Sequence, residues 1–209
     1  MLTLLLNGDY ATFILLLAGI IFSLSIHEFG HAWMAKLQGE TTAQLAGRLS
    51  VNPVAHIDPW GLIMVILVGI GYAKPVPVNP ANFRSAYGNL LVAAAGPGMN
   101  LLMALIAVNV FHHTAGATSP LLGQVLLNLA LINMLLAVFN LLPIGPLDGH
   151  YILPYLLPRS LAARYVVLND RYGTMLLLGL IVAAILWLPL FDILLGFSQT
   201  LLAGLVVTL

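Results

Sequence analysis

The sequence predicts an α-helical polytopic membrane protein with about five transmembrane helices and one shorter segment that enters the membrane and returns. Two observations support this prediction. Hydrophobic residues make up 61% of the 209-residue chain and charged residues only 7%, whereas an ordinary soluble domain is about 25% charged. The apolar residues also gather in uncharged runs long enough to cross a bilayer, which takes about 20 residues per helix.

The first predicted helix covers Tyr10 to Lys36. At 1.5 Å per residue it would be about 40 Å long, so that one end would protrude from the bilayer. The last apolar stretch, Thr174–Leu209, is interrupted by Pro189. This break predicts one span ending near Leu188, followed by a second span or an interfacial helix. The two other uncharged runs, each expected to form one span, are Asn89–Phe111 and Leu121–Leu142.

A shorter apolar segment, Trp60–Ala73, is not long enough to cross the bilayer. Because the basic residues Arg48 and Lys74 flank it, both of its ends should lie on the same side. The flanking pieces Arg48–Val51 and Pro75–Val78 are strand-like, and prolines suit an edge strand or an extended loop. We therefore expect a re-entrant loop or a β-hairpin in the cytoplasmic half of the membrane, with its backbone covered by protein.

The basic residues predict the orientation of the chain. If the N-terminus lies outside, every basic residue falls on one side of the membrane, and the loop between His112 and Pro120 on the other side has none. The basic side is then expected to be cytoplasmic. The seven basic residues are Lys36, Arg48, Lys74, Arg84, Arg159, Arg164 and Arg171.

The charge balance and the absence of cysteine exclude several classes of function. Seven basic and seven acidic residues give a formal net charge of zero. Without a basic excess, the chain is not expected to bind nucleic acid. Its apolar composition predicts that it is surrounded by the lipid bilayer. With no cysteine, there is no disulfide framework, and a bound metal must use nitrogen and oxygen ligands.

The segment His27–His31, with the sequence His-Glu-Phe-Gly-His, is the strongest functional signal. Residues four apart project from the same face of a helix, so the two imidazoles could hold one Zn²⁺ ion. Glu28, between them, could act as general base on a water that the metal activates. Two polar core histidines are the alternative, but ionisable groups inside a transmembrane helix are costly and usually functional.

A catalytic zinc also needs a third protein ligand. Asp148 is the candidate, because it follows a segment in which Pro143, Gly145 and Pro146 prevent a regular helix at the end of an uncharged span. Such an unwound segment could direct the carboxylate toward the two histidines. An ordinary Asp-Gly turn at the membrane surface is the alternative.

These residues resemble the site-2 protease family of intramembrane zinc metalloproteases, peptidase family M50. The resemblance extends from about Ile20 to Tyr151. It implies that His27, His31 and Asp148 bind one zinc ion and that Glu28 is the catalytic base. It also implies that Asn140 helps to hold the substrate or the oxyanion. The motifs that carry the resemblance are His27–His31, Asn52–Gly61, Ala73–Pro80, Ala95–Asn100 and Asn140–Gly149.

Members of this family cleave transmembrane segments of membrane protein substrates. The resemblance is to compact prokaryotic members, so a multi-pass protein of a prokaryotic cell membrane is expected, with its active site opening to the cytoplasm. Residues 1–209 are expected to form a single membrane-embedded core without a PDZ domain or a soluble regulatory domain.

Three further polar residues are candidates for the site. Asn100, beside a Gly-Pro-Gly bend in a predicted span, could face the site. His56 and Asp58 could orient a zinc ligand or replace one, although Asp58-Pro59 is also a common turn dipeptide. A metal-ion transporter, another metal-binding membrane protein and an inactive relative of the proteases remain alternatives, because buried His and Asp also line ion paths.

Overall fold

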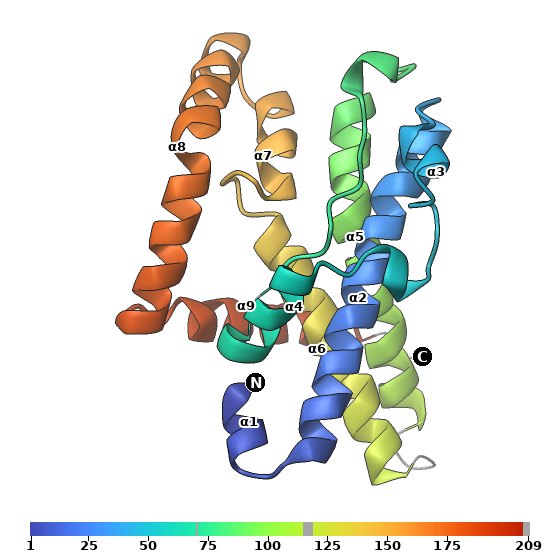
Figure 1. The fold of residues 1–209 in the computed structure, drawn as a ribbon, viewed down its shortest axis with the longest axis vertical. Coiled ribbons are helices and arrows are strands. Elements are labelled where there is room, and N and C mark those ends of the chain that lie inside the picture. The colour runs from blue at the N-terminus through green and yellow to red at the C-terminus, as the bar shows by residue number, and fades with distance from the viewer. Residues whose placement is uncertain (70, 115–118, 207–209) are drawn as a thin grey trace.

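The computed structural model describes residues 1–69, 71–114 and 119–206, and the regular elements in these ranges are all helices (Figure 1). The α-helices are α1 (Leu2–Leu6), α2 (Tyr10–Leu37), α3 (Thr42–Leu45), α4 (Pro59–Val68), α5 (Gly88–Thr114), α6 (Pro120–Asn140), α7 (Asp148–Ile152), α8 (Arg159–Leu186) and α9 (Leu190–Gly204). Short 3₁₀ turns cover Pro53–Ala55, Pro80–Asn82 and Leu153–Tyr155.

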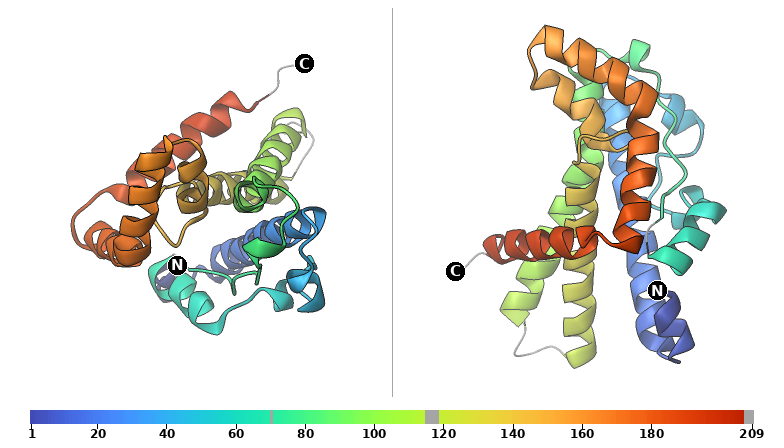
Figure 2. Two further views of the ribbon diagram at one scale, coloured as in Figure 1. Left: turned by 90° about the horizontal axis from the view of Figure 1, so that it is seen from above. Right: turned by 90° about the vertical axis from the view of Figure 1, so that its left-hand side faces the viewer.

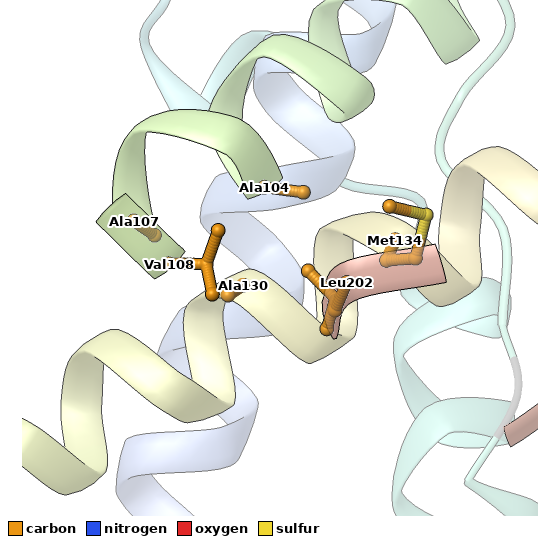
Figure 3. Close-up of a cluster of buried hydrophobic side chains, with 6 residues drawn as sticks. All are labelled: Ala104, Ala107, Val108, Ala130, Met134 and Leu202. Carbon is orange, nitrogen blue, oxygen red and sulfur yellow. The ribbon is translucent and has the colours of Figure 1, made fainter. Parts of the chain in front are cut away.

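The core of the molecule consists of α2, α5 and α6, which lie side by side (Figures 1 and 2). The contact between α5 and α6 is the most extensive, and that between α2 and α5 is the next. Small side chains bring α5 and α6 together, as is common between membrane helices, and α9 adds a leucine to the same cluster. The buried cluster in Figure 3 contains Ala104, Ala107, Val108, Ala130, Met134 and Leu202.

Helices α8 and α9 lie at the edge of this core. α8 stands apart from α2 and α5 in Figure 1, and only Gly173 and Leu177 of its 28 residues are buried. α9 runs crosswise to the long helices (Figure 2) and packs on α6, with Leu194, Ser198 and Leu202 buried. Much of the apolar surface of α8 is therefore left for lipid to cover.

Four of these helices, α2, α5, α6 and α8, are long and apolar enough to cross a membrane, which makes the chain an integral membrane protein. α9 has 15 residues and would be about 22 Å long, shorter than the roughly 30 Å hydrocarbon layer. About five spans were expected, and the structure supports four. α5 continues through Pro97, as membrane helices often do where neighbouring helices support the backbone.

The segment around α4 differs from the expected β-hairpin. No strand is present in the described ranges, and the apolar segment forms helix α4 instead. The prolines at positions 75 and 77 explain part of this difference, because they lack the backbone N–H that a strand ladder needs. The segment does double back as expected: the Lys74 N–H donates to the His56 carbonyl over 2.8 Å.

Two features hold this helical hairpin together. A β-carbon on Gly61 would lie 1.9 Å from the Tyr72 carbonyl oxygen, so the outgoing and returning backbones touch where glycine leaves room. The buried Arg48 guanidinium donates hydrogen bonds to the carbonyls of Ala55, Lys74 and Pro75. Arg48 thereby ties both ends of the hairpin to the loop that precedes it.

Candidate metal centre

Two histidines in the C-terminal half of α2 face α5. The Nε2 atoms of His27 and His31 lie 3.0 Å apart, as the spacing of four residues predicted. Glycines allow the two helices to approach here: a β-carbon on Gly30 would lie 2.8 Å from the Ala95 carbonyl oxygen. On the α5 side, a β-carbon on Gly96 would lie 2.3 Å from His31 Nε2.

Asp148 completes a group of three potential ligands. Its Oδ2 lies 3.1 Å from His27 Nε2, and its Oδ1 lies 3.4 Å from His31 Nε2. One potential ligand atom from each residue lies within 4.8 Å of the others.

The chain reaches Asp148 through the irregular segment that follows α6. The helix ends at Asn140, and the segment after it contains Pro143 and a cis peptide bond before Pro146. The backbone packs tightly at Gly149, where a β-carbon would lie 2.3 Å from the Leu141 carbonyl oxygen. This unwound segment brings the carboxylate to the two histidines, as the sequence predicted.

The hydrogen bonds of the two histidine Nδ1 atoms indicate that His27, His31 and Asp148 fit a cation. His27 Nδ1 lies 2.6 Å from Asn100 Oδ1, and His31 Nδ1 lies 2.7 Å from the Val92 carbonyl oxygen. Both oxygens can only accept, so each Nδ1 carries a proton, and in the neutral ring Nε2 then presents a lone pair. Two lone pairs therefore face each other beside a carboxylate, whose buried Oδ2 accepts no hydrogen bond. A positive ion relieves this arrangement, and two nitrogens with one oxygen suit zinc.

Glu28 lies next to His27 on α2 and is half-buried. Its carboxylate forms no hydrogen bond or ion pair with any residue in the described ranges.

Asn100 belongs to a buried polar network behind His27. Besides facing the imidazole, it donates from Nδ2 to Asn133 Oδ1 over 2.8 Å. Asn133 in turn donates to Ser23 Oγ over 2.8 Å, and all three of these side chains are fully buried. Sequence analysis missed Asn133 and Ser23. The sequence did contain a sign of their importance, because the amide of Asn133 and the hydroxyl of Ser23 lie in otherwise apolar spans, where polar groups are costly.

The other candidates lie outside the group of three. Asn140 donates from Nδ2 to the Leu136 carbonyl of its own helix. His56 is buried and its Nε2 lies 2.7 Å from the Ser50 carbonyl oxygen. Asp58 is the N-cap of α4, where Oδ1 accepts from the backbone N–H groups of Trp60 and Gly61. The contacts of His56 and Asp58 thus indicate that both residues stabilise the α4 hairpin.

Comparison with known proteins agrees with this geometry. "Putative zinc metalloprotease YwhC" of Bacillus subtilis (strain 168) is 37% identical over 171 residues, 78% of this chain and 78% of YwhC. "Putative zinc metalloprotease Rip2" of Mycolicibacterium smegmatis (strain ATCC 700084 / mc(2)155) is 31% identical over 154 residues, 71% of this chain and 60% of Rip2. No solved structure matches the chain. The profile of peptidase family M50 matches residues 14–119, which include His27–His31 and Asn100. With this match and the similarity to YwhC, the chain belongs to peptidase family M50.

Proposed function

We propose that this protein is an intramembrane zinc metalloprotease that hydrolyses peptide bonds in or near transmembrane segments of membrane proteins. The observation that carries the proposal is the convergence of His27 Nε2, His31 Nε2 and the Asp148 carboxylate. Glu28 follows His27 in the sequence. The histidines lie on a helix long and apolar enough to cross a membrane. The names of YwhC and Rip2 support the same activity.

Each residue of the site has a separate proposed role. His27, His31 and Asp148 hold one zinc ion, and zinc at this position supplies Lewis-acid activation of water. Glu28 accepts the proton from the attacking water and passes it to the leaving amide nitrogen. Asn140 has a second amide N–H besides the one donated to Leu136, and that group would hold the substrate carbonyl.

The substrate is expected to bind as an extended strand, because the peptide bonds of a helix are hidden in hydrogen bonds. The returning segment of the α4 hairpin forms neither a helix nor a strand from Tyr72 to Asn79, and its last residue, Asn79, has an extended backbone. Val76 and Val78 lie in this stretch. Their N–H groups form no hydrogen bond within the described ranges. They would pair with the substrate by strand addition.

The arrangement in the membrane follows from the charged residues. Lys36 lies in the last turn of α2, and α3 and the start of α8 lie at the same end of the molecule, opposite the C-terminal end of α5 (Figure 1). We propose that this end is cytoplasmic and that the N-terminus is outside. His27 lies nine residues before Lys36, about 13 Å along the helix, so the site lies within the membrane and opens to the cytoplasm.

Two shorter elements complete the proposed arrangement. The α4 hairpin re-enters the membrane from the cytoplasmic side, and α9 is a fifth membrane-embedded helix held against α6. Residues 1–209 act as one core in the cell membrane of a prokaryote, as the bacterial origin of YwhC and Rip2 suggests.

Cleavage of a model transmembrane substrate by the purified wild-type protein and by Glu28→Gln tests the function. The glutamine keeps the size of the side chain but cannot take a proton, so cleavage should fall by about 10²–10⁴ while zinc stays bound. Cleavage by Glu28→Gln at the wild-type rate would contradict the mechanism. Zinc movement across vesicles by a wild-type protein that cuts nothing would favour a transporter instead.

A further inference from the structure

We propose that Asn133 and Ser23, acting through Asn100, fix the His27 ring so that its Nε2 lone pair faces the metal. The residues form one continuous path from α6 and α2 to the zinc site. Asn133 contacts Ser23 and Asn100, and Asn100 contacts His27. This inference rests on the proposed function, because it requires His27 to be a zinc ligand.

Backbone carbonyl oxygens, which can only accept, fix the direction of the hydrogen bonds along this path. Asn133 Nδ2 lies 2.8 Å from the Leu129 carbonyl oxygen as well as 2.8 Å from Ser23 Oγ. A carbonyl oxygen has no proton to donate, so the NH₂ group of Asn133 must face Leu129. Its Oδ1 therefore faces Asn100 and accepts the hydrogen bond from Asn100 Nδ2.

The orientation of Asn100 is fixed a second time by the backbone of α2. Its Nδ2 also donates to the Ser23 carbonyl over 3.2 Å. If the amide were reversed, its oxygen would face the Ser23 carbonyl and the Asn133 oxygen, and both contacts would join two acceptors. Asn100 and Asn133 are completely buried, so water could not relieve these contacts, and the reversed orientation would be costly.

The orientation of Asn100 determines which nitrogen of His27 can bind the metal. With Asn100 Oδ1 held 2.6 Å from Nδ1, that nitrogen must carry the proton, which leaves Nε2 free to bind zinc. Asn100 and Asn133 are therefore positioning residues: they are not expected to touch zinc or substrate. They determine which nitrogen of His27 is available and hold the plane of the ring.

Zinc affinity tests this inference without relying on proteolysis. The full-length protein is titrated against a chelator of known affinity. Asn100→Leu removes the acceptor at similar volume and should bind zinc about 10–100-fold more weakly. Asn100→Asp keeps an acceptor for His27 but sets an oxygen against the Ser23 carbonyl and Asn133 Oδ1, so it should also bind zinc more weakly than the wild type. Asn133→Leu leaves Asn100 in place and should still weaken zinc binding.

Asn109→Leu is the matched control, because it makes the same substitution on the same helix at a residue that bonds Leu105 and Leu205 instead. It should keep the wild-type zinc affinity. The visible spectrum of the Co²⁺-substituted protein should change in Asn100→Leu and stay the same in Asn109→Leu. If Asn133→Leu does not fold, Ser23→Ala replaces it and should weaken zinc binding in the same direction.

The outcomes separate this inference from the proposed function. Wild-type affinity in both Asn100→Leu and Asn133→Leu would overturn the inference, and so would an equal loss in Asn109→Leu. A wild-type protein that binds no zinc would overturn the proposed function itself.

Discussion

Gly96 of α5 lies directly against the His31 imidazole of α2. A β-carbon on Gly96 would lie 2.3 Å from His31 Nε2 and 2.7 Å from His27 Cε1, closer than unbonded carbon and nitrogen atoms can approach. The backbone of α5 thus forms one wall of the metal centre, and the His31 Nδ1 hydrogen bond to the Val92 carbonyl comes from the same wall.

Gly96→Ala should therefore displace the two histidines and weaken zinc binding. The added methyl group meets the imidazoles and not the end of a flexible chain, so it has no easy way to move aside. Gly98→Ala is the control, because a β-carbon there has nothing within 4 Å. Measured zinc content should fall in Gly96→Ala and stay at the wild-type value in Gly98→Ala. Equal zinc content in both variants would contradict the position assigned to the metal.

Removal of a ligand should abolish tight zinc binding. We expect His31→Ala and Asp148→Ala to lose most of their zinc, because each removes one of three converging ligands. His56→Ala should keep its zinc, since His56 lies outside this group and bonds the Ser50 carbonyl. Elemental analysis of the purified variants measures the difference. Full zinc retention in Asp148→Ala would exclude Asp148 as a ligand and leave His56 or Asp58 to be tested in its place.

The sequence predicted the long apolar helices well because their ends coincide with changes in polarity. The helix expected from Tyr10 to Lys36 is found at Tyr10–Leu37, where Asp9 caps its start. α8 begins at Arg159, although the expected span began at Thr174. The helix extends beyond the apolar run into a charged segment, and hydropathy does not detect that extension.

Two parts of the structure depend on contacts that a local pattern does not contain. The α4 segment was expected to contain strand pieces, but the flanking chain is held by Arg48 without a strand ladder. Asn133 and Ser23 lie far apart in the sequence and meet only when α2 and α6 pack together. The histidine spacing, in contrast, is a property of one helix. The structure brings His27 and His31 together as expected, while their role as metal ligands stays a prediction.

The orientation of the chain can be tested with single cysteines, because the natural sequence has none. Ala86 and His113 are exposed residues near opposite ends of α5. In intact cells, an impermeant thiol reagent should label His113→Cys and not Ala86→Cys, which should react only after the membrane is opened. Labelling of Ala86→Cys from outside would reverse the topology and the side from which water reaches the site.

The position of Asp148 should depend on α8, although α8 supplies no ligand. Asn169 of α8 accepts a hydrogen bond from the Gly145 backbone N–H over 2.9 Å, and Tyr165 donates to the Pro143 carbonyl over 2.9 Å. Both contacts hold the irregular segment that leads to Asp148. Because few residues of α8 are buried, these polar contacts are important for keeping the segment in place.

Asn169→Leu should therefore weaken zinc binding. The Gly145 N–H would lose its acceptor, which costs about 1–3 kcal/mol for a buried group, and the segment would shift to find another. Asp170→Asn at the next position is the control, because Asp170 is 65% exposed and lies 3.4 Å from His150 Nε2. Exposed pairs of this kind contribute little. Chelator competition should show up to about a tenfold loss in Asn169→Leu and none in Asp170→Asn, whereas equal affinities would mean that α8 does not position Asp148.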